Sequence, residues 1–508
     1  MFAMKKVLYA LLFLPCCLAS QNMYNVIPAA DNNLTGTARF VGMGGSMSAL
    51  GGDVSVIGTN PAGIALFRSN DFSFTASVNF NKSEAEYVAR KSKSDVSYVG
   101  LDNIGFVLSN PISDNDWKYL NFGINYNRKN NFKEDFEMSG LADGFSQQYI
   151  IDDIYRRNPF AIDGLSEEMY SGFNFNWLTL LMAEGYYGYE DAEDFITDPN
   201  GLLLMAPDEI GYYSEKRGGV DNVELNVSAN YNDFLYLGVT LGFSNIDYSN
   251  YSCYFENDKL GEIYSIVNNY RVEGNGVNLK LGAIIRPFKY SPFKIGLAVH
   301  SPTWYKLTDI YSSSIAATDG YIYDTRDPER FCDEVRIDYK VSTPWRLNAS
   351  MSYTFGTFLA LNAEYEYADY SSMEFSSGRA VSKAQNQEVE RNLKAQHTFR
   401  VGAECKLGNF SIRSGYCHNT SPFEKDAYKN LDNANITDTS TDYVNKLKKD
   451  ILTIGGGYRY KNFYFDVAYM LQTQKADFYP FYDTEYENPA ANVEYTNSSV
   501  IATMGIRF

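Results

Sequence analysis

Acid–base chemistry is the first possibility that the residue types of this chain raise, because Glu364 and Glu366 lie two positions apart. Residues at i and i+2 of a β-strand share one face, so the two carboxyl groups are neighbours and could act as general acid and general base. Arginines recur on comparable faces nearby, and a ladder of structural ion pairs is the favoured interpretation. The other charged residues of this set are Arg346, Arg400, Glu404, Arg413, Arg459, Asp466 and Arg507.

Histidine chemistry is limited, because the whole chain contains three histidines: His300, His397 and His418. None lies in a nucleophile motif, which disfavours a Ser/His/Asp enzyme. So few histidines also leave little room for a multi-histidine metal site. His300 lies on a predicted inward face and could be an axial haem ligand, so haemin binding stays open as an alternative. We therefore expect neither a catalytic site nor a metal or cofactor.

The cysteines separate by face. Cys405 shares the apolar face of a predicted strand with Val401, and Cys417 shares a polar face with Arg413. In a membrane barrel, where the apolar face meets lipid and the polar face meets the interior, Cys405 is predicted to be a free thiol that points to lipid and Cys417 points inward. These two are not expected to pair. Cys253 and Cys332 fall in or near predicted loops and could form a disulfide, although the sequence says nothing of their geometry.

The segment 21–70 is rich in Gly, Ala, Ser and Asn and lacks alternation. Its glycines from Gly36 to Gly45 superficially resemble a dinucleotide fingerprint, but Met47 replaces the third glycine and no strand precedes the run. Small residues instead allow close backbone packing, as a plug inside a barrel requires. Asn60, Pro61, Ala62 and Gly63 follow, and Pro61 fixes its own φ and restricts Asn60 to an extended shape.

Composition and charge exclude several classes. Acidic residues outnumber basic ones by 62 to 44, and the net charge of −18 argues against a nucleic-acid partner. Apolar residues make up 45% and charged residues 21%, which excludes wholesale disorder. The chain has 42 Tyr and 33 Phe, residues that favour strands and amphipathic boundaries.

Residues 1–20 have the layout of a cleaved secretory signal peptide. Lys5 and Lys6 precede the apolar run 7–14, and the small residues Ala19 and Ser20 follow. The run is too short to cross a bilayer as a helix. We expect an exported protein whose mature chain starts near residue 21.

Strict alternation of apolar and polar residues dominates the rest of the chain. Phe72, Phe74 and Val78, for example, alternate with Ser73 and Thr75, which places the two sets on opposite faces of a strand. After residue 20 no apolar run approaches 18 residues, so a helical membrane protein is excluded. We predict fourteen strands, near 71–81, 101–109, 118–128, 222–231, 234–247, 272–287, 293–304, 338–355, 357–370, 396–407, 409–417, 451–460, 462–472 and 497–508.

The connections between these strands alternate between six short turns and seven long loops. The predicted long loops are 82–100, 129–221, 248–271, 305–337, 371–395, 418–450 and 473–496. Short turns at one end and long loops at the other are typical of an outer-membrane β-barrel, with the loops outside the cell. A soluble β-sandwich gives similar alternation and stays the alternative.

The largest predicted loop, 129–221, carries unusually many apolar residues. Exposed apolar surface of this extent usually marks a binding site, so a ligand groove is one interpretation, and packing of these residues on one another is the other. The groove candidates are Phe173, Phe175, Trp177, Leu178, Leu181, Leu202, Leu203 and Leu204.

The glycine-rich run and the Asn60-Pro61-Ala62 triplet resemble the N-terminal hatch of FadL/TodX-type outer-membrane transporters of long-chain fatty acids and other hydrophobic compounds. The runs at 301–305, 343–347 and 366–371 are similar to a Bacteroidetes-type branch of that family. The resemblance implies an all-β, 14-stranded antiparallel transmembrane barrel (71–508) with a hatch (21–70) in its lumen. It also implies capture of a ligand among the loops and lateral release through a wall opening beside the hatch. Asn60, Pro61, Ala62 and Gly63 are the candidate gating residues, expected beside that opening.

The leading functional prediction is therefore uptake of a fatty acid-like or other hydrophobic small molecule by a monomeric outer-membrane barrel in contact with lipid. Two other classes stay open. One is a non-transporting barrel of the same family that acts in surface protein secretion, attachment or haemin binding. The other is an outer-membrane enzyme, which no motif supports.

Overall fold

The computed structural model describes residues 22–112, 116–149, 207–259, 261–317, 322–324, 334–377, 380–430, 438–481 and 489–508. All of its strands belong to one antiparallel sheet. They are β1 (Asp71–Tyr87), β2 (Arg90–Pro111), β3 (Trp117–Asn131), β4 (Glu134–Leu141), β5 (Glu209–Tyr231), β6 (Leu235–Asn257), β7 (Glu262–Ile285), β8 (Lys294–His300), β9 (Trp304–Ala317), β10 (Ile322–Asp324), β11 (Val335–Ser342), β12 (Arg346–Phe355), β13 (Leu359–Asp369), β14 (Glu374–Ser377), β15 (Ala380–Val381), β16 (Ala395–Leu407), β17 (Phe410–Asn419), β18 (Tyr443–Tyr460), β19 (Phe463–Tyr479) and β20 (Ala491–Arg507).

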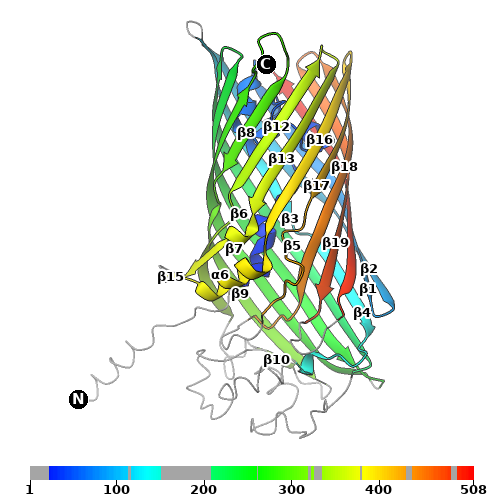
Figure 1. Ribbon diagram of the computed structural model, residues 1–508. Coiled ribbons are helices and arrows are strands. Elements are labelled where there is room, and N and C mark those ends of the chain that lie inside the picture. Colours follow the sequence, from blue (N-terminus) through cyan, green and yellow to red (C-terminus); the bar gives the residue numbers. More distant parts are fainter. Residues whose placement is uncertain are drawn as a thin grey trace, which may run out of the picture.

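The sheet closes into a barrel because β1 pairs with β20 along its length, from Asp71↔Arg507 to Glu86↔Asn492 (Figure 1). Four barrel strands are divided into two pieces: β3 with β4, β8 with β9, β11 with β12, and β13 with β14. Each pair follows one continuous line along its neighbours, so the ring contains fourteen strands. The predicted all-β fold and the predicted strand number are both confirmed.

The six predicted short turns lie at the end of the barrel that holds the C-terminus, at the top of Figure 1. Two of the predicted long loops are wrong. β1 and β2 meet at Val88 and Ala89, while β6 ends at Asn257 and β7 begins at Glu262, so most of 82–100 and 248–271 is strand. Neither face of these extensions is uniformly apolar or polar, and they therefore lack the alternation from which strands were predicted.

The two faces of the barrel differ as the alternation predicts. On β1, Phe72 is 43% exposed whereas the neighbouring Ser73 is fully buried. On β6, apolar outward residues run from Leu235 to Phe243 and polar ones follow. Nine residues of strand, tilted as in known barrels, span roughly 20–25 Å, which matches the apolar band of membrane barrels.

The N-terminal segment lies against the inner face of the ring. It contains α2 (Met23–Ala30), α3 (Ala38–Gly42) and the short 3₁₀ helices η1 (Val54–Gly58) and η2 (Pro61–Leu66), and Figure 1 shows α2 in dark blue behind the front strands. Each helix begins at a polar capping residue whose side chain accepts a backbone N–H bond: Asn22, Thr37, Asp53 and Asn60.

Two further helices, η6 (Tyr370–Ser372) and α6 (Lys383–Asn392), lie between β13 and β16. Among the described helices, none is long and apolar enough to cross a membrane. The predicted signal peptide, 1–20, lies outside the described residues.

Candidate functional site

Ion pairs fasten the N-terminal segment to the barrel wall. The guanidinium of Arg39, on α3, forms two parallel contacts with the carboxylate of Glu404 on β16, at 2.9 and 3.0 Å, and donates to the carbonyl oxygen of Gly52 at 2.8 Å. Glu404 also accepts from Arg413 Nε at 2.6 Å. This arrangement ties residues 22–70 to two neighbouring strands through one carboxylate.

The predicted ion-pair ladder is confirmed. Arg400 Nη1 lies 2.8 Å from Glu364 and 3.1 Å from Glu366, and Arg346 Nη1 lies 2.8 Å from Glu366. The side chains of both glutamates are at most 2% exposed. Because arginines neutralise both carboxylates, the pair has the environment of a structural network and not of a general acid and base. Of the other predicted members, Arg413 binds Asp466 at 2.5 Å, Arg507 binds Asp71 at 2.7 Å, and Arg459 is exposed near the short-turn end.

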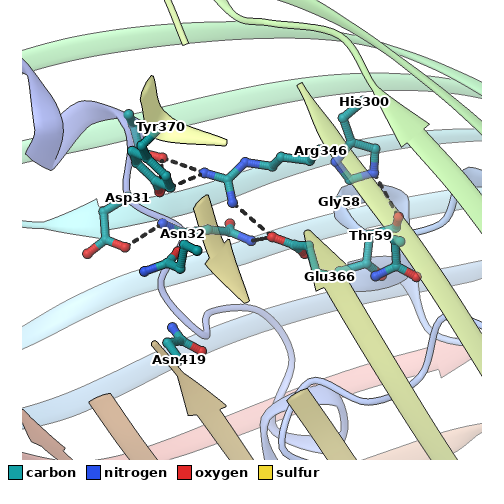
Figure 2. Close-up of polar contacts among 12 residues, drawn as sticks. Asp31, Asn32, Gly58, Thr59, His300, Arg346, Glu366, Tyr370 and Asn419 are labelled. Atoms are coloured by element: carbon teal, nitrogen blue, oxygen red, sulfur yellow. Dashed lines mark hydrogen bonds and ion pairs between the residues drawn. The ribbon is translucent and has the colours of Figure 1, made fainter. Parts of the chain in front are cut away.

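Residues 31–35 belong to the connection between α2 and α3 and form a strap across the lumen. Asn32 Nδ2 donates to Glu366 at 3.3 Å, and Lys449 Nζ contacts Asn33 Oδ1 at 2.8 Å and Asp31 at 3.4 Å. Figure 2 shows Arg346 between Glu366 and Tyr370, and its Nη2 also donates to the carbonyl oxygen of Ala30 at 2.5 Å. The strap is therefore held by charged groups on several strands.

The haemin alternative depends on His300, which Figure 2 shows beside Thr59. Its Nε2 lies 2.8 Å from the carbonyl oxygen of Thr59, so that nitrogen is already engaged. The adjoining cavity, which also borders the strap, has a volume of about 80 Å³. Known ligand pockets are several times larger, and this geometry does not favour a porphyrin.

A larger cavity, of about 180 Å³, lies on the loop side of the strap, between α2 and the inner wall. It combines aromatic, amide and charged side chains. The residues that border it include Tyr24, Ile27, Asp31, Asn130, Phe132, Lys133, Tyr248, Asn250, Phe423, Lys446, Gln472, Gln474 and Asn497. Asn33 borders both cavities, so the strap separates them.

The barrel wall is interrupted between β2 and β3. Their pairing runs from Pro111↔Tyr119 to Asn103↔Asn127 and stops, although β2 continues for thirteen more residues. In the described part of the chain, that extension pairs only with β1. Register shifts that skip Asp102 on β2 and Lys129 on β3 lie at this level, and such bulges bend strands.

Beyond the interruption, β4 turns inward and contacts the inner face of β1. Asn81 Nδ2 donates to the carbonyl oxygen of Lys133 at 2.7 Å, and Ser83 Oγ donates to that of Asp135 at 3.0 Å. On the outer rim, Asp221 accepts from Tyr126 at 2.7 Å and pairs with Arg128 at 2.5 Å. The two halves of the wall thus separate at a defined point that the larger cavity borders from inside.

The predicted hatch triplet lies elsewhere on the wall. Asn60 Nδ2 donates to the carbonyl oxygen of Ala283 on β7 at 3.3 Å, and Asn226 Nδ2 on β5 donates to that of Pro61 at 3.4 Å. A Cβ at Gly282 would lie 2.1 Å from Asn60 Oδ1, so only glycine permits this approach. The structure brings Ala62 and Gly63 into the same buried packing, which lies nearer the short-turn end of the barrel than the interruption does.

Cys405 is a free thiol, as predicted, and Cys417 is not its partner; both are free among the described residues. Cys417 is buried and its thiol contacts Asn419 Oδ1 at 3.3 Å, whereas Cys405 follows the outward register of Val401. Cys253 lies within β6 and not in a loop, and its proposed partner Cys332 lies outside the described residues. All eight predicted groove residues, from Phe173 to Leu204, also lie outside them.

Several residues that shape the interior were missed from the sequence. Lys280 forms a buried ion pair with Glu224, and Lys449 holds the strap. The interruption is visible in the sequence as a change in alternation. The outward-facing residues Val99 and Leu101 are two positions apart, but the next one, Ile104, follows after three positions, which shifts the alternation by one residue. Within the described ranges, no three His, Cys, Asp or Glu side chains come together as a metal site.

No family model and no curated protein matches this chain. Among solved structures, a Pseudomonas aeruginosa FadL homologue matches with a TM-score of 0.53 and 12% identity over 94% of this chain and 99% of that one. The Pseudomonas putida toluene transporter TodX matches with a TM-score of 0.51 and 14% identity over 94% and 100%. The resemblance expected from the sequence is therefore confirmed in the fold, and this chain shares the barrel architecture of FadL- and TodX-type outer-membrane proteins.

Proposed function

We propose that this protein takes up hydrophobic small molecules through the outer membrane and releases them sideways into the bilayer. The outer face supports a membrane location, because exposed apolar side chains ring the barrel while polar ones fill it. A closed barrel leaves few backbone groups unpaired in lipid. The long connections, including 142–208, would face the outside of the cell, and the short turns the periplasm.

The interruption between β2 and β3 is the observation that carries this proposal. It starts at Asp102, level with Ala76 and Val78 on β1, and both of these point outward. A passage at this height would open into the hydrocarbon layer. A hydrophobic molecule is more stable there than in water, so lateral release needs no aqueous step.

The N-terminal segment acts in this proposal as a hatch that closes the axial route. It contacts strands around the whole ring, from Thr503 on β20 to Lys280 on β7. Asn60, Pro61, Ala62 and Gly63 would anchor it against β5–β8. Because the anchor lies away from the interruption, a ligand could pass sideways without displacement of the whole segment.

The loop residues Phe173, Phe175, Trp177, Leu178, Leu181, Leu202, Leu203 and Leu204 keep their proposed role as a capture groove. Long-chain fatty acids are one substrate class that such a groove would suit. From the groove, the ligand would move to the larger cavity, which lies between the loop end and the interruption.

The test is to fill the interruption. Gly100, on β2, faces inward, and a Cβ there would lie 3.2 Å from Asp102 Oδ1 and from Ser77 Oγ, both flexible side-chain atoms. Gly100→Phe therefore places a ring in the opening with small adjustments. Gly456→Phe is the matched control, because Gly456 is exposed on the outer face and a Cβ there meets only one atom, at 3.9 Å.

Uptake of a radiolabelled fatty acid and of radiolabelled toluene should be measured in cells that carry equal amounts of folded barrel. We expect Gly100→Phe to reduce uptake at least fivefold and Gly456→Phe to leave it unchanged. Equal uptake by both variants and the unaltered protein would refute lateral release at this site.

A further inference from the structure

A third cavity lies on the outer side of the barrel wall, beside the hairpin of β1 and β2. Its volume is about 370 Å³, which is within the range of known ligand pockets. Strands β1, β2, β18, β19 and β20 border it, and they supply three lysines and four carboxylates. Among these, Lys93, Lys475 and Glu494 are exposed. Neither the uptake route nor the N-terminal segment accounts for this cavity.

The cavity lies just beyond the apolar band of the barrel. On β1, Phe80 is exposed on the outward face, and Glu84 and Glu86 follow on the same face. Glu84 is four residues beyond Phe80, which corresponds to roughly 10 Å of height on a tilted strand. In the membrane orientation proposed above, this level is the headgroup layer of the outer leaflet. The inference rests on that part of the proposed function.

The charges around the cavity are only partly paired. Lys93 Nζ lies 3.2 Å from Glu84 Oε1, in an exposed pair that water screens. On the opposite side of the cavity, Lys475, Asp477 and Glu494 take part in no ion pair among the described residues. The cavity therefore offers charges of both signs to a ligand.

Two of the carboxylates are unfavourably placed. Glu84 on β1 and Glu494 on β20 are directly opposite in the register of the two strands. Side chains in such positions are neighbours, and like charges there repel. A divalent cation relieves this repulsion, because Ca²⁺ and Mg²⁺ prefer carboxylate and other oxygen ligands. In the described part of the chain no third acidic side chain completes a metal site, so the remaining oxygen ligands have to come from a bound molecule or from water.

We propose that this cavity binds the phosphorylated headgroup of a glycolipid in the outer leaflet, with a divalent cation between its phosphate and the Glu84–Glu494 pair. The register places Lys93 next to Glu84, and Lys475 next to Glu494, so a lysine flanks the pair on each side. These ammonium groups bind further phosphate oxygens through charge-assisted hydrogen bonds. The four carboxylates of the cavity repel an acidic protein surface, whereas a phosphate that shares a cation with them is attracted.

Lipid A with its phosphates and enzymatically dephosphorylated lipid A are the matched probes. Binding of each to the detergent-solubilised full-length protein is measured by isothermal titration calorimetry, in magnesium and in EDTA. The double variant Lys93→Gln, Lys475→Gln removes the flanking charges, and Glu494→Gln removes one carboxylate of the pair. Lys289→Gln is the control, because Lys289 is exposed in a short turn at the opposite end of the barrel.

We expect the double variant to raise the dissociation constant of phosphorylated lipid A by on the order of tenfold, and Lys289→Gln to leave it unchanged. EDTA should weaken binding to the unaltered protein. It should have little effect on Glu494→Gln, which lacks the pair that holds the cation. All four substituted side chains are exposed or lie at the cavity rim, so the barrel should fold in each variant.

Equal affinity for the two forms of lipid A, or an unchanged dissociation constant in the double variant, would overturn the proposal. So would an EDTA effect of the same size in Glu494→Gln. Inorganic phosphate that competes with the affinity of the lipid would also overturn it, because the cavity would then recognise a free anion. Failure of the uptake function is a different result, since it appears as equal uptake by Gly100→Phe and the unaltered protein and leaves lipid binding intact.

Discussion

Replacement of Arg39 by methionine should release the N-terminal segment from the barrel wall. Arg39 is the only residue of α3 whose side chain pairs with a carboxylate in the described structure, through two contacts to Glu404. Methionine retains most of the aliphatic stem and removes the guanidinium. Glu404 keeps its contact with Arg413, so the substitution does not leave an isolated buried charge.

The magnitude follows from the hydrogen bonds that the guanidinium of Arg39 makes. There are three, all charge-assisted: two to Glu404 and one to the carbonyl oxygen of Gly52. The side chains of Arg39 and Glu404 are 20% and 16% exposed, which places the pair between a surface pair and a fully buried one. We expect the substitution to weaken attachment of the segment by about 3 kcal/mol, which raises the population of released segment by on the order of a hundredfold.

Planar-bilayer recording of the purified barrel is the assay, because a released segment opens the charged lumen to ions. The fraction of time in a conducting state should rise by on the order of a hundredfold in Arg39→Met, and less in Arg39→Lys. Arg90→Met is the control, since Arg90 pairs with Glu209 at an exposed site, where a pair contributes about 1 kcal/mol or less. Unchanged conductance in a correctly inserted Arg39→Met barrel, or an equal rise in Arg90→Met, would refute the reasoning.

Three further predictions concern the segment and the thiols. Deletion of residues 21–66 should raise ion conductance and abolish selective uptake, and a deletion barrel with unaltered conductance and uptake would contradict the hatch proposal. Burial by itself would raise the pKa of Asp31, but Lys449 and Lys446 hold it at about 2, so its stabilising effect is complete above about pH 4 and is lost as the pH falls toward 2. Asp31→Asn should therefore reduce the free energy of unfolding by about 2 kcal/mol at pH 7 and leave it unchanged at pH 2 in thermal unfolding, and an equal effect at both pH values would contradict this. A membrane-soluble maleimide should label Cys405 and leave the buried Cys417 unmodified in mass mapping of peptides, whereas labelling of Cys417 alone would reverse the assignment of faces.

The inside and outside of the barrel could be predicted from the sequence, because successive side chains of a strand point to opposite faces. Whether a residue stands at an odd or an even position of its strand (its parity) therefore assigns its face. Phe72 and Ser73 show this on β1, and Val401 and Arg400 on β16. The same parity correctly separated Cys405 from Cys417. Strand number followed from counting alternating segments, because each barrel strand crosses one apolar band.

The ends of the strands could not be predicted in this way. Beyond the apolar band, residues such as Glu84 and Lys93 lie opposite one another on an outward face that meets water. The inner face there mixes the polar Ser83 with Ala85 and Tyr87. Because neither face is uniformly apolar or polar, the two-residue period is weak, and the sequence predicts a long loop where the structure has a hairpin at Val88 and Ala89. Backbone pairing continues there because it depends on the neighbouring strand and not on hydrophobicity.

The interior contacts were decided by the tertiary structure. Alternation places Glu404 in the lumen, but it does not tell which arginine will reach it, and Arg39 lies 365 positions away. The interruption is marked in the sequence by a one-residue shift of the alternation between Leu101 and Ile104. The inward turn of β4 behind β2 is not visible there, because it depends on contacts with Asn81 and Ser83 of β1. Parity is a local property of one strand and is therefore written in the sequence, whereas partners across the lumen depend on closure of the whole ring, which brings distant segments together.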